Sequence, residues 1–471
     1  MSSPENRSGL RREMGFWDVL LFNIAAVLGP RWIAAAAHNG VSSLSLWALA
    51  ALLFFFPTAL IIVELSTRFP NEGGLYVWTK EAFGDFHGFV AGWSYWVYTI
   101  FYFPGLLLAS VAMSVYIGGP KAAWLADNRP YQMAASLALL AIAVGLNLVG
   151  LHIGKWLQNA GGVGTYVPLV MLVAVGGILW LRHGSATAFT WSATLPRFNF
   201  DTVNFWSQIA FAFTGLELVC AMSEEVRNPQ RNFPRAIYAS GALIAAIYIM
   251  GTLALLAIIP AGSVNVQNGV FQALGSGSAA MGLAWLGIIA ALLVTVGNAG
   301  GVGSTVAGVA RVPFVVGLDR YLPQWFGKLH PKWRTPYIAI LVQGAISAVV
   351  LLLSQVSETL RGAYQVLVDA AILLYFLPFL YMYAAAMRLA FRRDRNQNPG
   401  AVLVPGGKAG VIIAGGLAFT ITAFAMALAL YPTADVANKA LFEIKLVGET
   451  AGSVLIGLFL YWRGARGSHK L

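Results

Sequence analysis

Long apolar stretches separated by short polar connectors follow one another along the whole chain. Most are close to or above the length of about 20 residues that a helix needs to cross a bilayer, and each is bounded by charges or by Gly and Pro. The stretches lie at 16–37, 43–64, 86–117, 131–150, 154–181, 204–223, 235–259, 281–312, 336–354, 363–387, 408–430 and 447–462. We therefore predict an all-α integral membrane protein with twelve transmembrane helices.

The segments outside these stretches are short. Residues 1–15 form a polar N-terminal tail that runs into the first span without a small-residue cleavage site, which is not typical of a signal peptide. Residues 463–471 form a C-terminal tail, so the membrane domain is expected to cover 16–462. The uncharged, Gly- and Ser-rich connector 260–280 is expected on the extracellular side.

Composition excludes a soluble globular enzyme. Of the 471 residues, 58% are hydrophobic and 10% are charged, whereas about a quarter of an ordinary soluble protein is charged. Cys220 is the only cysteine, which excludes an intramolecular disulfide and zinc sites with three or four thiolates. No histidine has metal-ligand spacing and no Walker-type loop is present. We expect no metal, no cofactor and no catalytic residues.

The net charge of +11 is explained by topology. If the N-terminal tail is cytoplasmic, 22 of the 30 Lys and Arg residues fall on that side and 7 on the other. Such an excess is typical of a protein with both termini in the cytoplasm, and we expect it in the plasma membrane. The sequence has no contiguous basic face, so it does not predict a nucleic-acid partner. The remaining basic residue, Arg31, lies inside the first span.

Two of the predicted helices contain residues that interrupt helical geometry. The first contains Gly29-Pro30 and the sixth contains Thr214-Gly215. Interrupted helices at corresponding positions in two halves indicate a transporter site at the bilayer midplane. The freed carbonyls of one half-helix and the positive N-terminal end of the next match the two ends of an α-amino acid. An ordinary proline kink is the alternative interpretation of Gly29-Pro30.

Three charged residues lie deep in predicted spans. They are Arg31, Glu217 and Asp369, and a charge at a helix centre costs about 2.5–3.5 kcal/mol on insertion scales. Arg31 directly follows the first break and Glu217 follows the second, which favours a functional role. The alternative interpretation is a buried charge pair that only holds helices together. For Asp369 neither interpretation is favoured over the other.

Aromatic and small residues supply further candidates. Among the aromatic residues of 93–103 and 211–213, we select Tyr98 and Phe211 for the cavity, although such runs are usually packing. The Gly-rich run 297–305 is better explained as a helix contact face than as a binding site. Asn298 and Thr305 within it remain weaker candidates.

Several motifs resemble those of the amino acid–polyamine–organocation permeases. They are Glu64-Leu65-Ser66-Thr67-Arg68-Phe69-Pro70-Asn71-Glu72-Gly73-Gly74-Leu75-Tyr76 through Phe83-Gly84 to Gly92-Trp93; Phe211-Ala212-Phe213-Thr214-Gly215-Leu216-Glu217 with Asn228-Pro229 through Pro234-Arg235-Ala236; Arg311 with Asp319-Arg320-Tyr321-Leu322-Pro323; and His330 through Thr335-Pro336. They follow the family order from the second span to the ninth.

The resemblance implies a LeuT-like fold of two inverted five-helix repeats, at 16–181 and 204–387, with two extra helices at 408–462. Substrate would bind between broken helices 1 and 6 and helices 3, 8 and 10. Phe211 matches the aromatic residue that covers the substrate in relatives. The chain departs from the family where typical members have a Gly-Ser-Gly-like run, since it has Gly-Pro-Arg-Trp. Some proton-coupled members have a lysine at the position of Thr165, and Arg31 is a candidate for supplying that charge.

These observations predict a secondary transporter for neutral or acidic amino acids, coupled to protons or working by exchange, with the lipid bilayer as its other partner. The candidate substrate-binding residues are Gly29, Pro30, Arg31, Trp32, Tyr98, Phe211, Ala212, Phe213, Thr214, Gly215, Asn298 and Thr305. The candidate coupling or gating residues are Arg31, Glu217 and Asp369. The alternatives are a non-transporting sensor on the same fold, a polyamine or organocation permease, and a membrane enzyme, which the lack of a catalytic constellation disfavours.

Overall fold

The computed structural model describes residues 10–196, 200–266, 268–354, 360–392, 400–430 and 439–468. Over these residues the chain is helical, and the only extended pairing is an isolated bridge between Met14 and Val226. The α-helices are α1 Phe16–Val27, α2 Pro30–His38, α3 Ser42–Ala50, α4 Phe56–Arg68, α5 Leu75–Phe83, α6 Asp85–Ser114, α7 Arg129–Val149, α8 Leu151–His183, α9 Trp191–Thr194, α10 Phe200–Ala212, α11 Pro229–Ile258, α12 Gly269–Ala280, α13 Trp285–Leu318, α14 Tyr337–Ser354, α15 Leu360–Ala390, α16 Gly407–Ala429 and α17 Lys439–Ser468. A π-helical turn, η1 Ala51–Phe55, joins α3 to α4, and the 3-10 helices are η2 Val115–Gly118, η3 Pro120–Asp127, η4 Leu218–Glu225, η5 Ala261–Ser263 and η6 Gln324–Gly327.

Ten helical segments in the described ranges are long and apolar enough to cross a membrane. The predicted ninth span is the shorter apolar helix α14, and the predicted sixth is divided between α10 and η4. The connector 260–280 contains η5 and α12, which packs against α8 and α13. The helical, membrane-spanning class is therefore confirmed, whereas the count of twelve spans and the inverted repeat stay predictions.

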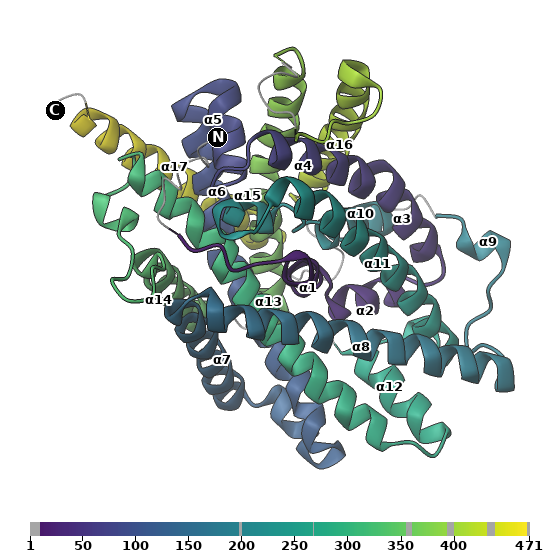
Figure 1. Ribbon diagram of the computed structural model, residues 1–471. Coiled ribbons are helices and arrows are strands. Elements are labelled where there is room, and N and C mark those ends of the chain that lie inside the picture. The colour runs from purple at the N-terminus through teal and green to yellow at the C-terminus, as the bar shows by residue number, and fades with distance from the viewer. Residues whose placement is uncertain are drawn as a thin grey trace.

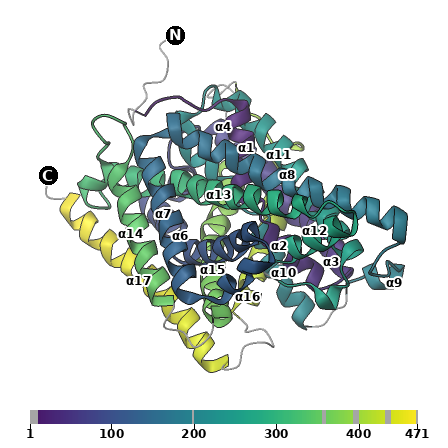
Figure 2. The same ribbon diagram turned by 90° about the horizontal axis from the view of Figure 1, so that it is seen from below.

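The helices pack around α1. Figure 1 shows this helix near the centre of the bundle, where it contacts α8, α11 and α13. α17 lies along the outer edge, against α6 and α15 (Figure 2), and most of its surface is exposed. The central position of α1 places the first predicted helix break inside protein and away from lipid.

The first span is divided between α1 and α2. Leu28 and Gly29 connect them in extended conformation, with φ/ψ of −75°/114° and −122°/119°. Pro30 begins α2, where its missing N–H removes no helical bond and its ring favours an extended residue before it. The hydroxyl of Tyr248 in α11 accepts a hydrogen bond from the Gly29 N–H at 3.2 Å and donates to the Val27 carbonyl at 2.8 Å. The predicted break at Gly29-Pro30 is confirmed.

The sixth span is interrupted between the end of α10 at Ala212 and the start of η4 at Leu218. Gly215 within the interruption has φ of +117°, and a Cβ atom there would lie 2.9 Å from Cγ2 of Val27, so glycine is needed at this position. The Tyr248 hydroxyl lies 3.1 Å from the carbonyl oxygen of Ala212. One side chain therefore contacts the backbone at both breaks, and the break predicted in this segment is confirmed.

α8 and α13 approach each other through glycines. A Cβ atom added at Gly161 of α8 would lie 2.5 Å from the Cα atom of Gly300 in α13. One added at Gly297 would lie 2.4 Å from Oγ1 of Thr165. The run 297–305 is therefore the close helix contact face that its small residues indicate.

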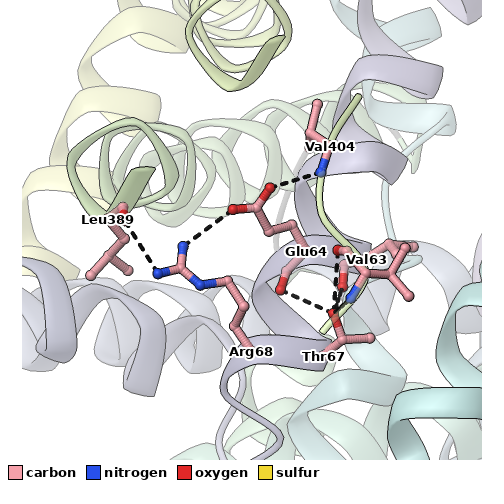
Figure 3. A network of polar contacts seen from close by, with 7 residues as sticks. Val63, Glu64, Thr67, Arg68, Leu389 and Val404 are labelled. Atoms are coloured by element: carbon pink, nitrogen blue, oxygen red, sulfur yellow. Dashed lines mark hydrogen bonds and ion pairs between the residues drawn. The ribbon is translucent and has the colours of Figure 1, made fainter. Parts of the chain in front are cut away.

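A buried ion pair joins the end of α4 to two distant segments (Figure 3). Glu64 accepts hydrogen bonds from Nη1 of Arg68 at 3.2 Å and from the N–H of Val404 at 2.9 Å. Nη2 of Arg68 donates to the carbonyl oxygen of Leu389, near the end of α15, at 3.2 Å. The pair thus connects α4 with α15 and with the segment that leads into α16.

Replacing Glu64 should destabilise the fold. Glu64→Ala leaves the Arg68 guanidinium, which is 10% exposed, without this carboxylate and leaves the Val404 N–H without its acceptor. Breaking a buried pair by removing one partner costs about 3–5 kcal/mol, and we expect the free energy of unfolding to fall by about 3 kcal/mol. Unfolding of the purified protein in detergent, followed by tryptophan fluorescence, measures this change.

The control is an exposed ion pair. Lys80 and Asp85 lie 3.0 Å apart, but their side chains are 33% and 47% exposed. Exposed pairs contribute about 0.2–1 kcal/mol, so Asp85→Asn should lower the free energy of unfolding by less than about 1 kcal/mol. Equal losses in the two variants would contradict the structural role assigned to Glu64.

Candidate functional site

Two cavities adjoin the break between α1 and α2. The larger contains about 420 Å³ of empty space, part of it open to solvent, and is lined by residues 25–32 together with residues of α6, α8 and α13. The smaller has a volume of about 350 Å³ and is lined by the break in the sixth span together with residues of α6, α13 and α15. Both cavities are lined by Ala26, Val27, Trp32 and Tyr102. The two helix breaks therefore lie beside neighbouring cavities that share part of their walls.

Arg31 places a positive charge in the wall of the larger cavity. Its side chain is buried, and Cζ of the guanidinium lies 4.6 Å from the ring centroid of Trp32 and 5.3 Å from that of Tyr102. Contacts of this kind stabilise a partly desolvated cation. Arg31 also lies in the first turn of α2, where its charge adds to the positive end of the helix dipole. This part of the cavity is suited to an anionic group.

Phe211 lies at the centre of an aromatic wall around the smaller cavity. Its ring meets those of Trp32, Tyr102 and Tyr375 edge to face, at centroid distances of 5.9, 6.0 and 5.6 Å. These rings come from α2, α6 and α15, so Phe211 connects three helices through contacts that aromatic pairs prefer. A small rotation of Phe211 would change the shape of this cavity.

Glu217 is fully buried in a network of tyrosine hydroxyls. Its Oε1 accepts hydrogen bonds from Tyr95 at 2.8 Å and from Tyr375, and its Oε2 accepts one from the N–H of Gly215 at 3.1 Å. The rings of Tyr95 and Tyr375 stack at 5.6 Å. The carboxyl group therefore connects α6 and α15 to the break in the sixth span.

The position of this network follows from the direction of the helices. The segment 10–15 bonds to the end of η4, since the backbone N–H groups of Glu13 and Met14 donate to the Glu225 carbonyl at 2.8 and 3.1 Å. We call this end of the molecule the N-terminal face. η4 leads from the break toward it, and Tyr95 lies one turn nearer to the start of α6 than Tyr98, which lines the smaller cavity. The Glu217 network therefore lies between the smaller cavity and the N-terminal face.

The structure brings most of the predicted binding residues to the cavities. Those that line one or both are Gly29, Pro30, Arg31, Trp32, Tyr98, Phe211, Thr214, Gly215, Asn298 and Thr305. Ala212 and Phe213 line neither, and the Phe213 ring packs against Trp47, Phe55 and Tyr248. Asp369 is buried in α15 but also lines neither cavity.

Four tyrosines at the site were not selected from the sequence. Tyr95 and Tyr102 belong to the aromatic run of α6, and their spacing of three and four residues from Tyr98 places them near it on one helix face. That spacing could have identified them. Tyr248 and Tyr375 carry no comparable local signal, because their partners lie in other helices.

The site shows no sign of metal chemistry in the part of the chain that the structure describes. No group of three or more His, Cys, Asp or Glu side chains there could hold a metal ion. The groups that line the cavities are a cation, aromatic rings, hydroxyl groups and the ends of broken helices.

Comparison with known proteins agrees with this arrangement. The amino acid permease family matches residues 14–444. An uncharacterized transporter of Legionella pneumophila is 28% identical over 461 residues, covering 97% of each chain. The serine/threonine exchanger SteT of Bacillus subtilis is 28% identical over 363 residues, covering 74% of this chain and 78% of the relative.

A solved structure shares this fold. The crystal structure of MhsT in complex with L-phenylalanine superposes with a TM-score of 0.65 at 13% sequence identity, covering 89% of this chain and 100% of MhsT. The family match extends from the N-terminal segment to α17, across both helix breaks. The protein thus belongs to the amino acid permease family of the amino acid–polyamine–organocation superfamily and is an integral membrane transporter.

Proposed function

We propose that this transporter moves amino acids across the plasma membrane by alternating access, with both termini in the cytoplasm. The observation that carries the proposal is the meeting of two broken helices at cavities that hold a buried cation on one side and a buried carboxyl network on the other. The excess of basic residues in the connectors supports a cytoplasmic N-terminal face. On this proposal the protein forms two inverted repeats and crosses the membrane twelve times.

The two ends of an amino acid find complementary groups at the first break. The carboxylate binds near Arg31 and the positive end of α2. The ammonium group binds near the carbonyl end of α1, whose last residues line both cavities. Phe211 covers the bound substrate from the second break. A zwitterion placed in this way satisfies groups that a broken helix leaves exposed.

The Glu217 network closes the path from the substrate to the cytoplasm. Glu217, Tyr95 and Tyr375 connect three helical segments between the smaller cavity and the N-terminal face. Opening that face separates these segments and breaks at least one of the hydrogen bonds. Glu217 then becomes accessible to solvent and can exchange a proton, which makes it a candidate coupling group.

The substrate class follows from the charge of Arg31. A guanidinium next to the binding position repels polyamines and other organic cations in a cavity of low dielectric, so we propose neutral or acidic amino acids. The serine/threonine exchange named for SteT supports a neutral amino acid. A sensor on the same fold would bind the same substrates without moving them.

Counterflow in liposomes tests the proposed function. Purified protein is reconstituted into liposomes that contain one unlabelled amino acid, and uptake of the labelled amino acid is measured across a broad panel, with and without a proton gradient. We expect accumulation of neutral or acidic amino acids and none of polyamines. Binding without uptake would instead identify a sensor, and neither binding nor uptake would refute the proposal.

Arg31→Ala should weaken substrate binding. A hydrogen bond between charged partners contributes about 1.5–3 kcal/mol, so we expect the dissociation constant to rise at least tenfold. Arg31→Lys keeps the charge and should recover part of the affinity. Equilibrium binding of labelled substrate to purified protein measures the effect.

Arg235→Ala on the exposed surface of α11 is the matched control, and it should leave the affinity unchanged. If Arg31→Ala binds as tightly as the wild type, Arg31 has no part in holding the carboxylate.

Tyr95→Phe and Tyr375→Phe should favour the state that is open to the cytoplasm. Each variant removes one hydroxyl that bonds to Glu217 in the closed state, and such bonds contribute about 1.5–3 kcal/mol. We expect the exchange rate to change at least threefold in each variant. Because Tyr95 does not line the cavities, Tyr95→Phe should leave substrate affinity within a factor of two of the wild type. Exchange kinetics and equilibrium binding separate these effects.

Tyr238→Phe removes an exposed hydroxyl on α11 and serves as the control, with no expected change in rate or affinity. Wild-type exchange rates in both Tyr95→Phe and Tyr375→Phe would show that this network does not control access.

A further inference from the structure

Two buried glutamates share one arginine at the N-terminal face. Arg311 in α13 donates from Nη2 to both carboxylate oxygens of Glu225 at 2.8 Å, and from Nε to one of them at 3.2 Å. Glu72, between α4 and α5, is farther away, with its Oε1 3.9 Å from Nε of Arg311. All three side chains are at most 3% exposed. The cluster therefore holds two carboxyl groups but one compensating cation.

Glu72 is the less satisfied of the two carboxyl groups. Its Oε2 accepts a hydrogen bond from the N–H of Glu224 at 2.9 Å. Its Oε1 is buried and has no hydrogen-bond partner within the described part of the chain. A carboxylate oxygen that is buried without a donor is costly, whereas a protonated carboxyl group needs fewer donors. The geometry therefore favours a neutral Glu72 next to an ionised Glu225.

A cavity of about 380 Å³ lies next to this cluster. Glu225 and Arg311 are part of its lining, and so are residues of the N-terminal segment and of the segment before α14. The other charged or titratable groups in the lining are Arg11, Glu13, His152, Lys332 and Arg334. The substrate cavities share no lining residue with it. This separate cavity thus reaches Glu225 and Arg311, whereas Glu72 lies behind them and is not part of its lining.

We propose that Glu72, Glu225 and Arg311 form a proton-binding site separate from the substrate cavities, and that Glu72 carries the proton while the N-terminal face is closed. The site joins three elements that must separate when this face opens, namely the segment before α5, the end of η4 and α13. This proposal rests on the proposed transport function in one respect only, the assignment of the N-terminal face to the cytoplasm. Proton binding then stabilises the closed cytoplasmic face.

The electrostatics of the cluster agree with a bound proton. Burial raises the pKa of Glu72 well above its usual value, and the neighbouring carboxyl group of Glu225 raises it further, while Arg311 opposes both effects. Burial also raises the pKa of Glu225, although Arg311 lowers it. The backbone N–H of Glu224 lowers the pKa of Glu72, and the Glu224 charge raises it by less. The charges of Glu224 and Glu13 both raise the pKa of Glu225. Apart from Arg311, the basic side chains that line the cavity are exposed, so solvent screens their charges.

The direction of the pH effect follows from linkage. The closed cluster has the raised pKa, so it binds a proton that the open, solvated cluster releases at the same pH. Low pH therefore favours the closed face. As the pH rises above about 4.3, the ordinary pKa of glutamate, the open face gains by up to about tenfold per pH unit until the raised pKa is passed.

Cys220 offers a built-in reporter of this opening. It is the only cysteine of the chain, is fully buried, and lies in η4 five residues before Glu225. The segment that carries Glu72 packs directly on it, since the Gly73 N–H donates to the Ala221 carbonyl at 2.9 Å. Separation of this segment from η4 exposes the thiol to a maleimide.

The test measures the rate at which fluorescein maleimide reacts with Cys220 in detergent-purified protein between pH 5 and pH 8, without substrate or gradient. Glu72→Gln mimics the protonated side chain. Because thiol reactivity itself depends on pH, the wild-type rate is divided by the Glu72→Gln rate at each pH. We expect this ratio to be near one at pH 5 and to rise at least tenfold by pH 8.

Two controls accompany this measurement, one with a variant and one without. Glu81→Gln makes the same change at an exposed position of α5, away from the cluster, and should keep the wild-type pH dependence. Division of the wild-type rate by the rate in detergent-unfolded wild type needs no variant and should rise with pH in the same way. A ratio that stays flat, or a Glu81→Gln protein that behaves like Glu72→Gln, overturns the proposal. Failure of counterflow would leave this result unaffected, so the two proposals fail separately.

Discussion

Hydrogen bonding of the interrupted backbone is the constraint on which the rest of this structure depends. A helix can be broken inside a bilayer only where other protein groups satisfy the freed N–H and C=O groups. The Tyr248 hydroxyl contacts Gly29, Val27 and Ala212, and therefore holds two breaks that are about 180 residues apart in the chain. The Glu217 carboxylate satisfies the Gly215 N–H within the second break. The cavities exist because these few polar contacts permit the helices to stop there.

Charge is distributed between two roles in this molecule. Most basic residues lie in connectors, where their uneven distribution supports the proposed orientation in the membrane. Arg31 and Arg311 are different, because both are buried and each meets a specific set of neighbours. Arg31 is surrounded by aromatic rings beside a cavity, and Arg311 by carboxyl groups at the N-terminal face. A substrate carboxylate and a proton would then neutralise charge at two separate places along the same path.

Local chemistry was enough to predict the breaks and much of the cavity wall. Gly29-Pro30 and Gly215 disturb helical geometry wherever they occur, and Arg31 inside an apolar span requires an unusual setting. One partner of Glu217 was not predictable in the same way. Tyr375 meets Glu217 only because α15 packs beside α6, which is a property of the assembled bundle. Phe213 was misplaced for the same reason, since its neighbour Phe211 faces the cavity while its own ring faces Trp47.

The glycine contact between α8 and α13 limits which motions are available. With Gly161 and Gly300 in backbone contact, neither helix can slide along the other without lifting away from it. The two helices therefore move as one rigid pair. Both contact α1, and both contribute residues to the wall of the larger cavity. On the proposed function, a change of access would be a rotation of the broken helices against this rigid pair, with the extended residues Leu28 and Gly29 as the joint. Such a joint lies at the proposed binding position, so substrate contacts and the angle between α1 and α2 would change together.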